Sequence, residues 1–216
     1  KLADLPFFYV LLAAGHTAVM REAQVEGAGA INHTAFASAV DLGAAESEYL
    51  IPGHPPRKQE VGRRVSLLAR ALIYGDTSID YLGPIVIVEK VTVAQATVTT
   101  VTIPFNVGTN GFLHLNGTGG CTLCCNMSAG ISPVSLLDPD AVEAVVTRTT
   151  SFSVDSASGT LTASVAQFKS SKGRVQVQFL FDNAPQCALY NGENSGPDSV
   201  YAADPHLGLV AQTWCG

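Results

Sequence analysis

Four side chains able to act in acid–base chemistry lie close together in the sequence. They occupy the segment that joins a predicted strand to a predicted helix, and they are Asp41, Glu46, Glu48 and His54. In open α/β sheets, functional groups gather at the carboxyl ends of strands, which is where this segment begins. A histidine held there can take a proton from a serine or a water, and the two prolines that follow His54 restrict its backbone. The alternative is a histidine in an ordinary loop with no catalytic task.

The sequence shows no nucleophile to accompany this base. A Gly-x-Ser-x-Gly turn is absent, and so are Gly-Asp-Ser and Gly-Gln-Ser. The nearest string, Gly75-Asp76-Thr77-Ser78, follows a predicted helix instead of a strand, so we interpret it as a helix end and a turn. There is also no glycine-rich phosphate loop, and we expect no cofactor.

Cysteine spacing favours disulfides over a metal site. The second half of the chain holds all five cysteines, Cys121, Cys124, Cys125, Cys187 and Cys215. Cys121 and Cys124 have the Cys-x-x-Cys spacing of a zinc site, but no second ligand pair follows at a useful distance. Structural disulfides are therefore the better interpretation. An odd count leaves one thiol, which is either free or bonded to another chain.

Three glycosylation sequons point to the secretory pathway. Their acceptor residues are Asn32, Asn116 and Asn126. One sequon is weak evidence, but three beside several cysteines favour a compartment where disulfides persist. We therefore expect an extracellular or lysosomal protein.

The first part of the chain, residues 1–82, has an α/β pattern. The apolar run at 6–13 predicts a core strand of a parallel sheet, so the chain is expected to begin inside a domain. A loop or short helix is expected around 17–25, and a second strand at 35–42 ends near Asp41. The clearest helix follows the two prolines, with Val61, Val65, Leu68 and Leu72 on one apolar stripe, its arginines mostly off that stripe and Gly75 at its end.

The remainder, residues 83–216, is rich in Val, Ile and Thr. Strands are predicted at 85–88, 91–105, 160–168 and 174–181, with turns at 106–111, 116–120 and 156–159. Short strands at regular spacing indicate an antiparallel β-sandwich-like domain. The tail at 191–216 has little strand signal and is predicted to be a loop.

Composition excludes several classes of protein. Only 14% of the 216 residues are charged, against about 25% in an average protein, which argues against a coiled coil. The net charge is −6 and there is no basic stripe, so nucleic acid is not an expected partner. No apolar run reaches the roughly 18 residues of a membrane span.

Spaced motifs over residues 1–84 resemble the sialate O-acetylesterases, a family of SGNH-type carbohydrate esterases. The motifs are Arg21-Glu22-Ala23-Gln24, Phe36–Asp41 leading to Leu42-Gly43, His54-Pro55-x-x-Lys58-Gln59-x-Val61-Gly62-x-Arg64, Ala69-Arg70-Ala71-Leu72-x-Tyr74-Gly75 and Gly83-Pro84. Beyond residue 90 the match is thin. There, Cys124-Cys125 and Cys187-Ala188-Leu189-Tyr190 look like features of the animal-type members, whose C-terminal region is β-rich.

The resemblance implies a flavodoxin-like SGNH domain, of which residues 1–82 are the C-terminal part. It makes His54 the catalytic histidine and places the serine nucleophile in an N-terminal part that is not in this sequence. Members of the family can be cut into two subunits, and this chain is similar to the C-terminal one. The implied substrate is an O-acetylated sialic acid or a related sugar, and Cys215 is a candidate for a disulfide to the N-terminal partner.

The sequence departs from the family just before His54. Many relatives have an acidic residue there, whereas this chain has Pro52 and Gly53. The third triad member is then Glu48, Glu46 or Asp41, or the site works as a dyad. The same departure allows a rival hypothesis, in which the chain is an inactive esterase-like glycoprotein that binds glycan or has a structural role in an assembly.

Overall fold

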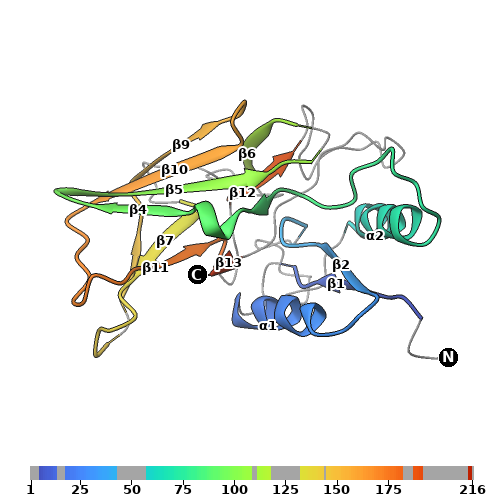
Figure 1. The fold of residues 1–216 in the computed structure, drawn as a ribbon, viewed down its shortest axis with the longest axis horizontal. Coiled ribbons are helices and arrows are strands. Elements are labelled where there is room, and N and C mark those ends of the chain that lie inside the picture. The colour runs from blue at the N-terminus through green and yellow to red at the C-terminus, as the bar shows by residue number, and fades with distance from the viewer. Residues whose placement is uncertain are drawn as a thin grey trace.

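A computed structural model describes residues 5–13, 18–42, 57–108, 111–117, 132–143, 145–181, 187–191 and 214–215. In these residues a small parallel β-α-β unit precedes several antiparallel sheets (Figure 1). The predicted change from an α/β pattern to an antiparallel one is thus confirmed. No helix in this part of the chain is long and apolar enough to cross a membrane.

The β-α-β unit consists of β1 (Phe7–Leu11), α1 (Ala18–Gly29) and β2 (Thr34–Ser38). The strands pair in parallel, with Phe7 opposite Thr34 and Leu11 opposite Ser38. Both predicted strands are present but shorter than expected, and α1 extends further than the predicted short helix. Residues 39–42 follow β2 as a buried turn, in which the N–H of Leu42 donates to the carbonyl of Ala39.

Helix α2 (Lys58–Leu72) packs on the strand pair with a face that differs from the predicted one. Leu68 is fully buried, but Leu72 at the end of the predicted stripe is 48% exposed. Arg63 and Arg64 are not part of the predicted apolar stripe, yet they are buried together with Glu60. A buried arginine is tolerated because carboxylates are near enough to pair with it.

The end of α2 follows the prediction. Gly75 has a φ of 71°, a left-handed conformation that glycine adopts without a steric penalty. The N–H of Asp76 then donates to the carbonyl of Arg70, which lies in the last turn of the helix. The carboxylate of Asp76 accepts hydrogen bonds from Ser78 and from the guanidinium of Arg70.

We expect the Asp76 carboxylate to contribute to acid sensitivity. Hydrogen bonds from Ser78, then from Arg70, hold its pKa at about 2, below the ordinary 3.8. Because folding lowers this pKa, the stabilisation is complete above about pH 4 and is lost as the pH falls towards 2. Asp76→Asn should therefore flatten the fall in unfolding free energy between about pH 4 and pH 2, measured by urea titration at each pH. An unchanged acid slope would contradict this assignment.

Eleven further strands make up the antiparallel sheets. They are β3 (Ile85–Val86), β4 (Thr92–Gln95), β5 (Val98–Asn106), β6 (Leu113–Gly117), β7 (Val134–Leu137), β8 (Val146–Arg148), β9 (Ser151–Asp155), β10 (Thr160–Ala166), β11 (Gln176–Phe179), β12 (Cys187–Asn191) and β13 (Trp214–Cys215), with a short 3-10 helix at Val88–Lys90. One sheet has the order β3-β5-β10-β9 with β4 also on β5, a second has the order β13-β11-β7-β8, and β12 pairs with β6. The predicted strands correspond to β3, β4, β5, β10 and β11, whereas β6, β7, β8, β9, β12 and β13 were not predicted. The strand β13 also lies in the tail that was predicted to be a loop, because two residues give no readable alternation.

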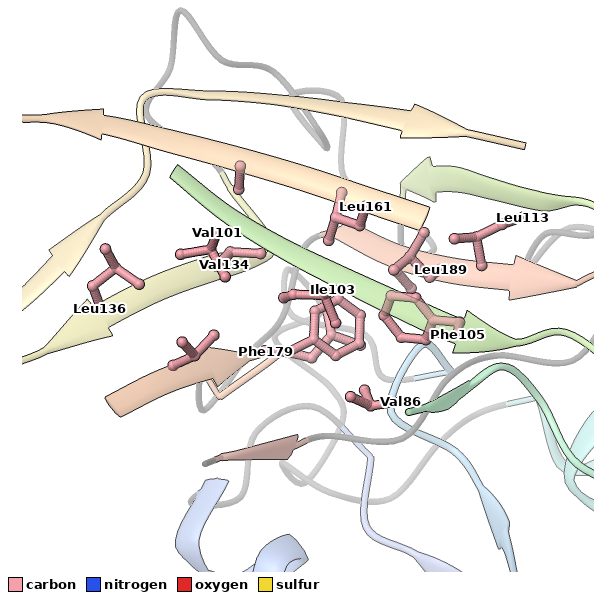
Figure 2. Close-up of a cluster of buried hydrophobic side chains, with 14 of the residues drawn as sticks. Val86, Val101, Ile103, Phe105, Leu113, Val134, Leu136, Leu161, Phe179 and Leu189 are labelled. Atoms are coloured by element: carbon pink, nitrogen blue, oxygen red, sulfur yellow. The ribbon is translucent and has the colours of Figure 1, made fainter. Parts of the chain in front are cut away.

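The main core is shared by strands of all three antiparallel sheets (Figure 2). Its pattern follows the strand period of two, since alternate residues of β5 are buried and those of β10 match them in register. Thus Ile103 lies opposite Leu161, and both are fully buried. From the second sheet, Leu136 and Phe179 enter the same core.

Buried contacts join the β-α-β unit to the antiparallel sheets. Val40, directly after β2, belongs to the main core. The guanidinium of Arg21 in α1 is fully buried and donates to the carbonyl of Leu180 at 3.4 Å. The side chain of Asn191 donates to the carbonyls of Leu82 and Val107. The boundary predicted between residues 82 and 83 stays a prediction, and contacts across it are extensive.

Candidate functional site

The predicted catalytic residues divide between described and undescribed parts of the chain. Asp41 is described, whereas His54, Glu48 and Glu46 lie outside the described residues. The structure does describe both flanks of their segment, with Leu42 fully buried on one side and Arg57 preceding α2 on the other. The described residues nearest to this segment are the groups that hold its two flanks.

Asp41 is fully buried and pairs with Arg64 through both carboxylate oxygens. Nη1 of Arg64 donates to Oδ1 at 2.7 Å, and Nη2 donates to Oδ2 at 2.9 Å. This two-point geometry fits the planar guanidinium to the planar carboxylate and gives a strong, directional ion pair. It fastens α2 to the chain just beyond β2.

The Arg64 guanidinium has further acceptors around it. Nη1 also donates to the carbonyl of Ser38 at the end of β2, and Nε donates to Glu60 at 2.7 Å. Burial disfavours the charged form, but the charge and hydrogen bonds of Asp41 and the charge of Glu60 outweigh it, so the pKa of Arg64 is raised. Arg64 is thus a permanent cation inside the protein.

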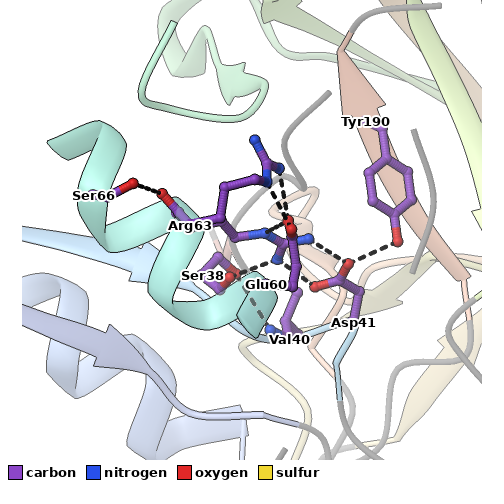
Figure 3. Close-up of polar contacts among 8 residues, drawn as sticks. Ser38, Val40, Asp41, Glu60, Arg63, Ser66 and Tyr190 are labelled. Atoms are coloured by element: carbon purple, nitrogen blue, oxygen red, sulfur yellow. Dashed lines mark hydrogen bonds and ion pairs between the residues drawn. The ribbon is translucent and has the colours of Figure 1, made fainter. Parts of the chain in front are cut away.

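Glu60 and Arg63 complete a group of four charged side chains (Figure 3). Nε and Nη2 of Arg63 each donate to a Glu60 oxygen at 2.7 Å. Nη1 of Arg63 is buried and has no hydrogen-bond partner among the described residues. Two carboxylates face two guanidinium groups, so the formal charges cancel, which lowers the cost of burial.

Tyr190 brings the antiparallel part of the chain to this cluster. Its hydroxyl, on β12, donates to Oδ2 of Asp41 at 3.0 Å. Burial, followed by the negative charge of Asp41, raises the pKa of Tyr190 well above its ordinary value, so the hydroxyl stays protonated as a donor. The ring of His114 stacks on Tyr190 with 5.6 Å between centroids. We refer to Asp41, Glu60, Arg63, Arg64 and Tyr190 as the buried polar cluster.

The buried polar cluster connects three elements, namely the end of β2, the first half of α2 and β12. A carboxylate offers about four acceptor positions, and the described contacts of Asp41 use three of them. This arrangement suits a residue that positions the chain around it. The predicted part of Asp41 in catalysis stays a prediction.

Sequence reasoning missed most members of the cluster. Glu60, Arg63 and Arg64 have the spacing of three and four residues that places charges together on a helix, so their pairing was readable. Their burial was not readable, because it depends on Asp41 and on the packing of α2. Tyr190 is separated from Asp41 by 149 positions, and no local pattern links the two.

The other predicted sites are described only in part. Asn32 is exposed in the turn before β2, as a glycosylation site must be, and Asn116 lies in β6. Cys187 lies in β12 opposite Gly117, and Cys215 lies in β13 opposite Gln178. The remaining candidates fall outside the described residues; they are Asn126, Cys121, Cys124 and Cys125.

One further surface feature is an open cavity of about 290 Å³ at the ends of β7, β8 and β10. Asp138, Glu143 and Lys169 line it, and it contains none of the predicted site residues. Within the described part of the chain, no three His, Cys, Asp or Glu side chains form a group that could hold a metal ion.

No protein-family model matches this chain, and neither does any curated protein.

Proposed function

We propose that this chain is the C-terminal part of a sialate O-acetylesterase-like carbohydrate esterase. In this proposal residues 1–82 complete a flavodoxin-like SGNH domain and residues 83–216 form a β-sandwich-like domain. The protein belongs to the secretory pathway and is extracellular or lysosomal. Its substrates are O-acetyl esters of sialic acids or related sugars.

The observation that carries the proposal is the way the buried polar cluster holds both flanks of residues 43–56. Arg64 binds the carbonyl of Ser38 and the carboxylate of Asp41 on the strand side, while it belongs to α2 on the other side. His54 precedes the first residue of α2 by four positions. An active-site base must be held within a fraction of an ångström, and a segment anchored at both ends meets that need better than a free loop.

In the proposed ester hydrolysis, the nucleophile is a serine supplied by the N-terminal part. His54 accepts the proton of the serine hydroxyl as the oxygen attacks the acetyl carbonyl. The protonated imidazole then gives this proton to the departing sugar oxygen. In the second step His54 takes a proton from water, the hydroxide attacks the acetyl-serine, and the proton returns to the serine oxygen as acetic acid leaves and ionises in the solvent. Glu48, Glu46 or Asp41 orients His54, or the site works as a dyad.

Reconstitution tests the proposal. The 216-residue chain alone should not hydrolyse 4-nitrophenyl acetate or an O-acetylated sialic acid above the buffer rate, because it lacks the nucleophile. The chain co-produced with the polypeptide encoded directly upstream should hydrolyse both. Hydrolysis by the chain alone would contradict the proposal, and so would an inactive complex whose upstream part has no serine motif.

The rival role is an inactive esterase-like glycoprotein that binds glycan or serves an assembly. Two observations favour it. Asp41 already has three donors, and Pro52-Gly53 stands where relatives carry an acidic residue. If none of Asp41, Glu46 and Glu48 orients His54 and the site does not work as a dyad, hydrolysis is lost. An upstream sequence without a serine nucleophile would decide for this role.

A further inference from the structure

Two large apolar side chains lie exposed at one end of the β-α-β unit. Phe7, the first residue of β1, and Ile31, in the turn between α1 and β2, are each 63% exposed. The N–H of Phe7 donates to the carbonyl of His33 at 2.9 Å, so the start of β1 and this turn are neighbours, as Figure 1 shows. Single exposed apolar residues are ordinary, but neighbouring ones form a small apolar surface that favours contact with another group.

The ring of Phe7 is held on the α1 side of the strand pair. It stacks on Tyr9, two residues along the same strand, with 6.4 Å between centroids and 24° between the ring planes. The hydroxyl of Tyr9 donates to the carbonyl of Gln24 in α1 at 2.6 Å, and alternate residues of a strand share one face. The ring of Phe7 is therefore supported by Tyr9, while much of its remaining surface meets solvent.

The same turn carries a predicted glycosylation site. Asn32 follows Ile31 directly, is exposed, and begins a sequon that leads into β2. The backbone of the turn is fixed on both sides, since the N–H of Ile31 donates to the carbonyl of Ala28 and the carbonyl of His33 accepts from the first residue of β1. A sugar attached to Asn32 thus starts from a fixed position close to both apolar side chains.

An N-linked glycan begins with N-acetylglucosamine, whose chemistry suits this surface. One face of the sugar ring carries C–H groups and the acetyl group adds a methyl, while the hydroxyls lie around the edge of the ring. Such a face packs on an aromatic or aliphatic side chain and leaves the hydroxyls in water, so no polar group is buried unpaired. Because the sugar is tethered next to the surface, its effective concentration there is on the order of millimolar, and a weak contact suffices.

We propose that the first N-acetylglucosamine on Asn32 packs against Phe7 and Ile31 and stabilises the β-α-β unit. This contact needs the secretory pathway but not the esterase chemistry, so it stands apart from the proposed function. The other candidate occupant of the surface is a protein segment, from residues 1–4 or from a partner. A bulky, hydrated glycan on the same turn keeps other segments away from it, which favours the chain's own sugar.

A double-mutant cycle tests the contact in the full 216-residue chain made in a glycosylating host. An endoglycosidase that leaves one N-acetylglucosamine per sequon gives a uniform sample, and mass spectrometry shows whether Asn32 carries the sugar. Asn32→Gln removes this sugar alone and should lower the folding equilibrium constant by about two- to tenfold, measured by urea unfolding. In a Phe7→Ala background the same change should have a much smaller effect, because the aromatic partner is already gone.

Val19→Ala is the matched control. Val19 is 65% exposed at the opposite end of α1 from the turn that carries Asn32, so Asn32→Gln should have the same effect in this background as in the wild type. An equal effect of Asn32→Gln in the wild type and in Phe7→Ala would overturn the proposal. A loss of stability from Phe7→Ala that does not depend on the sugar would then assign the surface to a protein segment. An unmodified Asn32 would overturn the proposal as well.

Discussion

We expect Asp41→Asn to lower the free energy of unfolding by about 3–5 kcal/mol. The change leaves Arg64 as a buried cation whose two-point partner has lost its charge. Glu60, which already binds both guanidinium groups, is then the one carboxylate left in the buried polar cluster. Removing one partner of a buried ion pair is costly because the other charge stays out of water without full compensation. Urea unfolding at pH 7, followed by circular dichroism, measures the loss.

Two variants control for this result. Asp76→Asn breaks an ion pair with Arg70 that is partly open to solvent, so its effect at pH 7 should be much smaller. Tyr190→Phe removes one hydrogen bond to Asp41 but keeps every charge, and should cost about 1.5–3 kcal/mol. If Asp41→Asn is as stable as the wild type, the buried polar cluster does not hold α2 to the strand pair.

If the proposed function is right, we expect His54→Ala in the complex with the N-terminal part to lower turnover by several powers of ten while leaving the fold intact. The imidazole is the proposed carrier of the serine proton in both half-reactions, and removal of a triad member leaves only the catalysis due to binding and the oxyanion hole. Initial rates with an O-acetylated sialic acid give the activity. Circular dichroism and size-exclusion chromatography show whether the complex is still formed.

His33→Asn is a suitable control for this variant. His33 is an exposed histidine in a turn, with a φ of 61° that asparagine also tolerates, and the change preserves the Asn32 sequon. It should keep wild-type turnover. Wild-type turnover by His54→Ala would exclude His54 as the general base, and equal losses in both variants would indicate a general effect of histidine replacement.

Much of the fold was predictable because it depends on local patterns. The apolar run of β1, the alternation of β5 and β10 and the glycine after α2 are signals within about ten residues of chain. The predicted ends of the strands were less accurate. A strand ends where its partner strand ends, and the local sequence does not show where that is. The buried face of α2 was misjudged because hydrophobic periodicity treats every arginine as solvent-facing.

The sequence by itself determined the change from a parallel to an antiparallel architecture, the places of the strands with clear alternation, and the set of residue types from which an acid–base site can be made. Only the tertiary structure decided that Arg64 is buried against Asp41, and that Tyr190 joins them. The physical reason is that burying a charge depends on its partners, and here one partner is 149 residues away. A sequence pattern records local propensity, whereas the compensation of a buried charge exists only once distant segments have packed together.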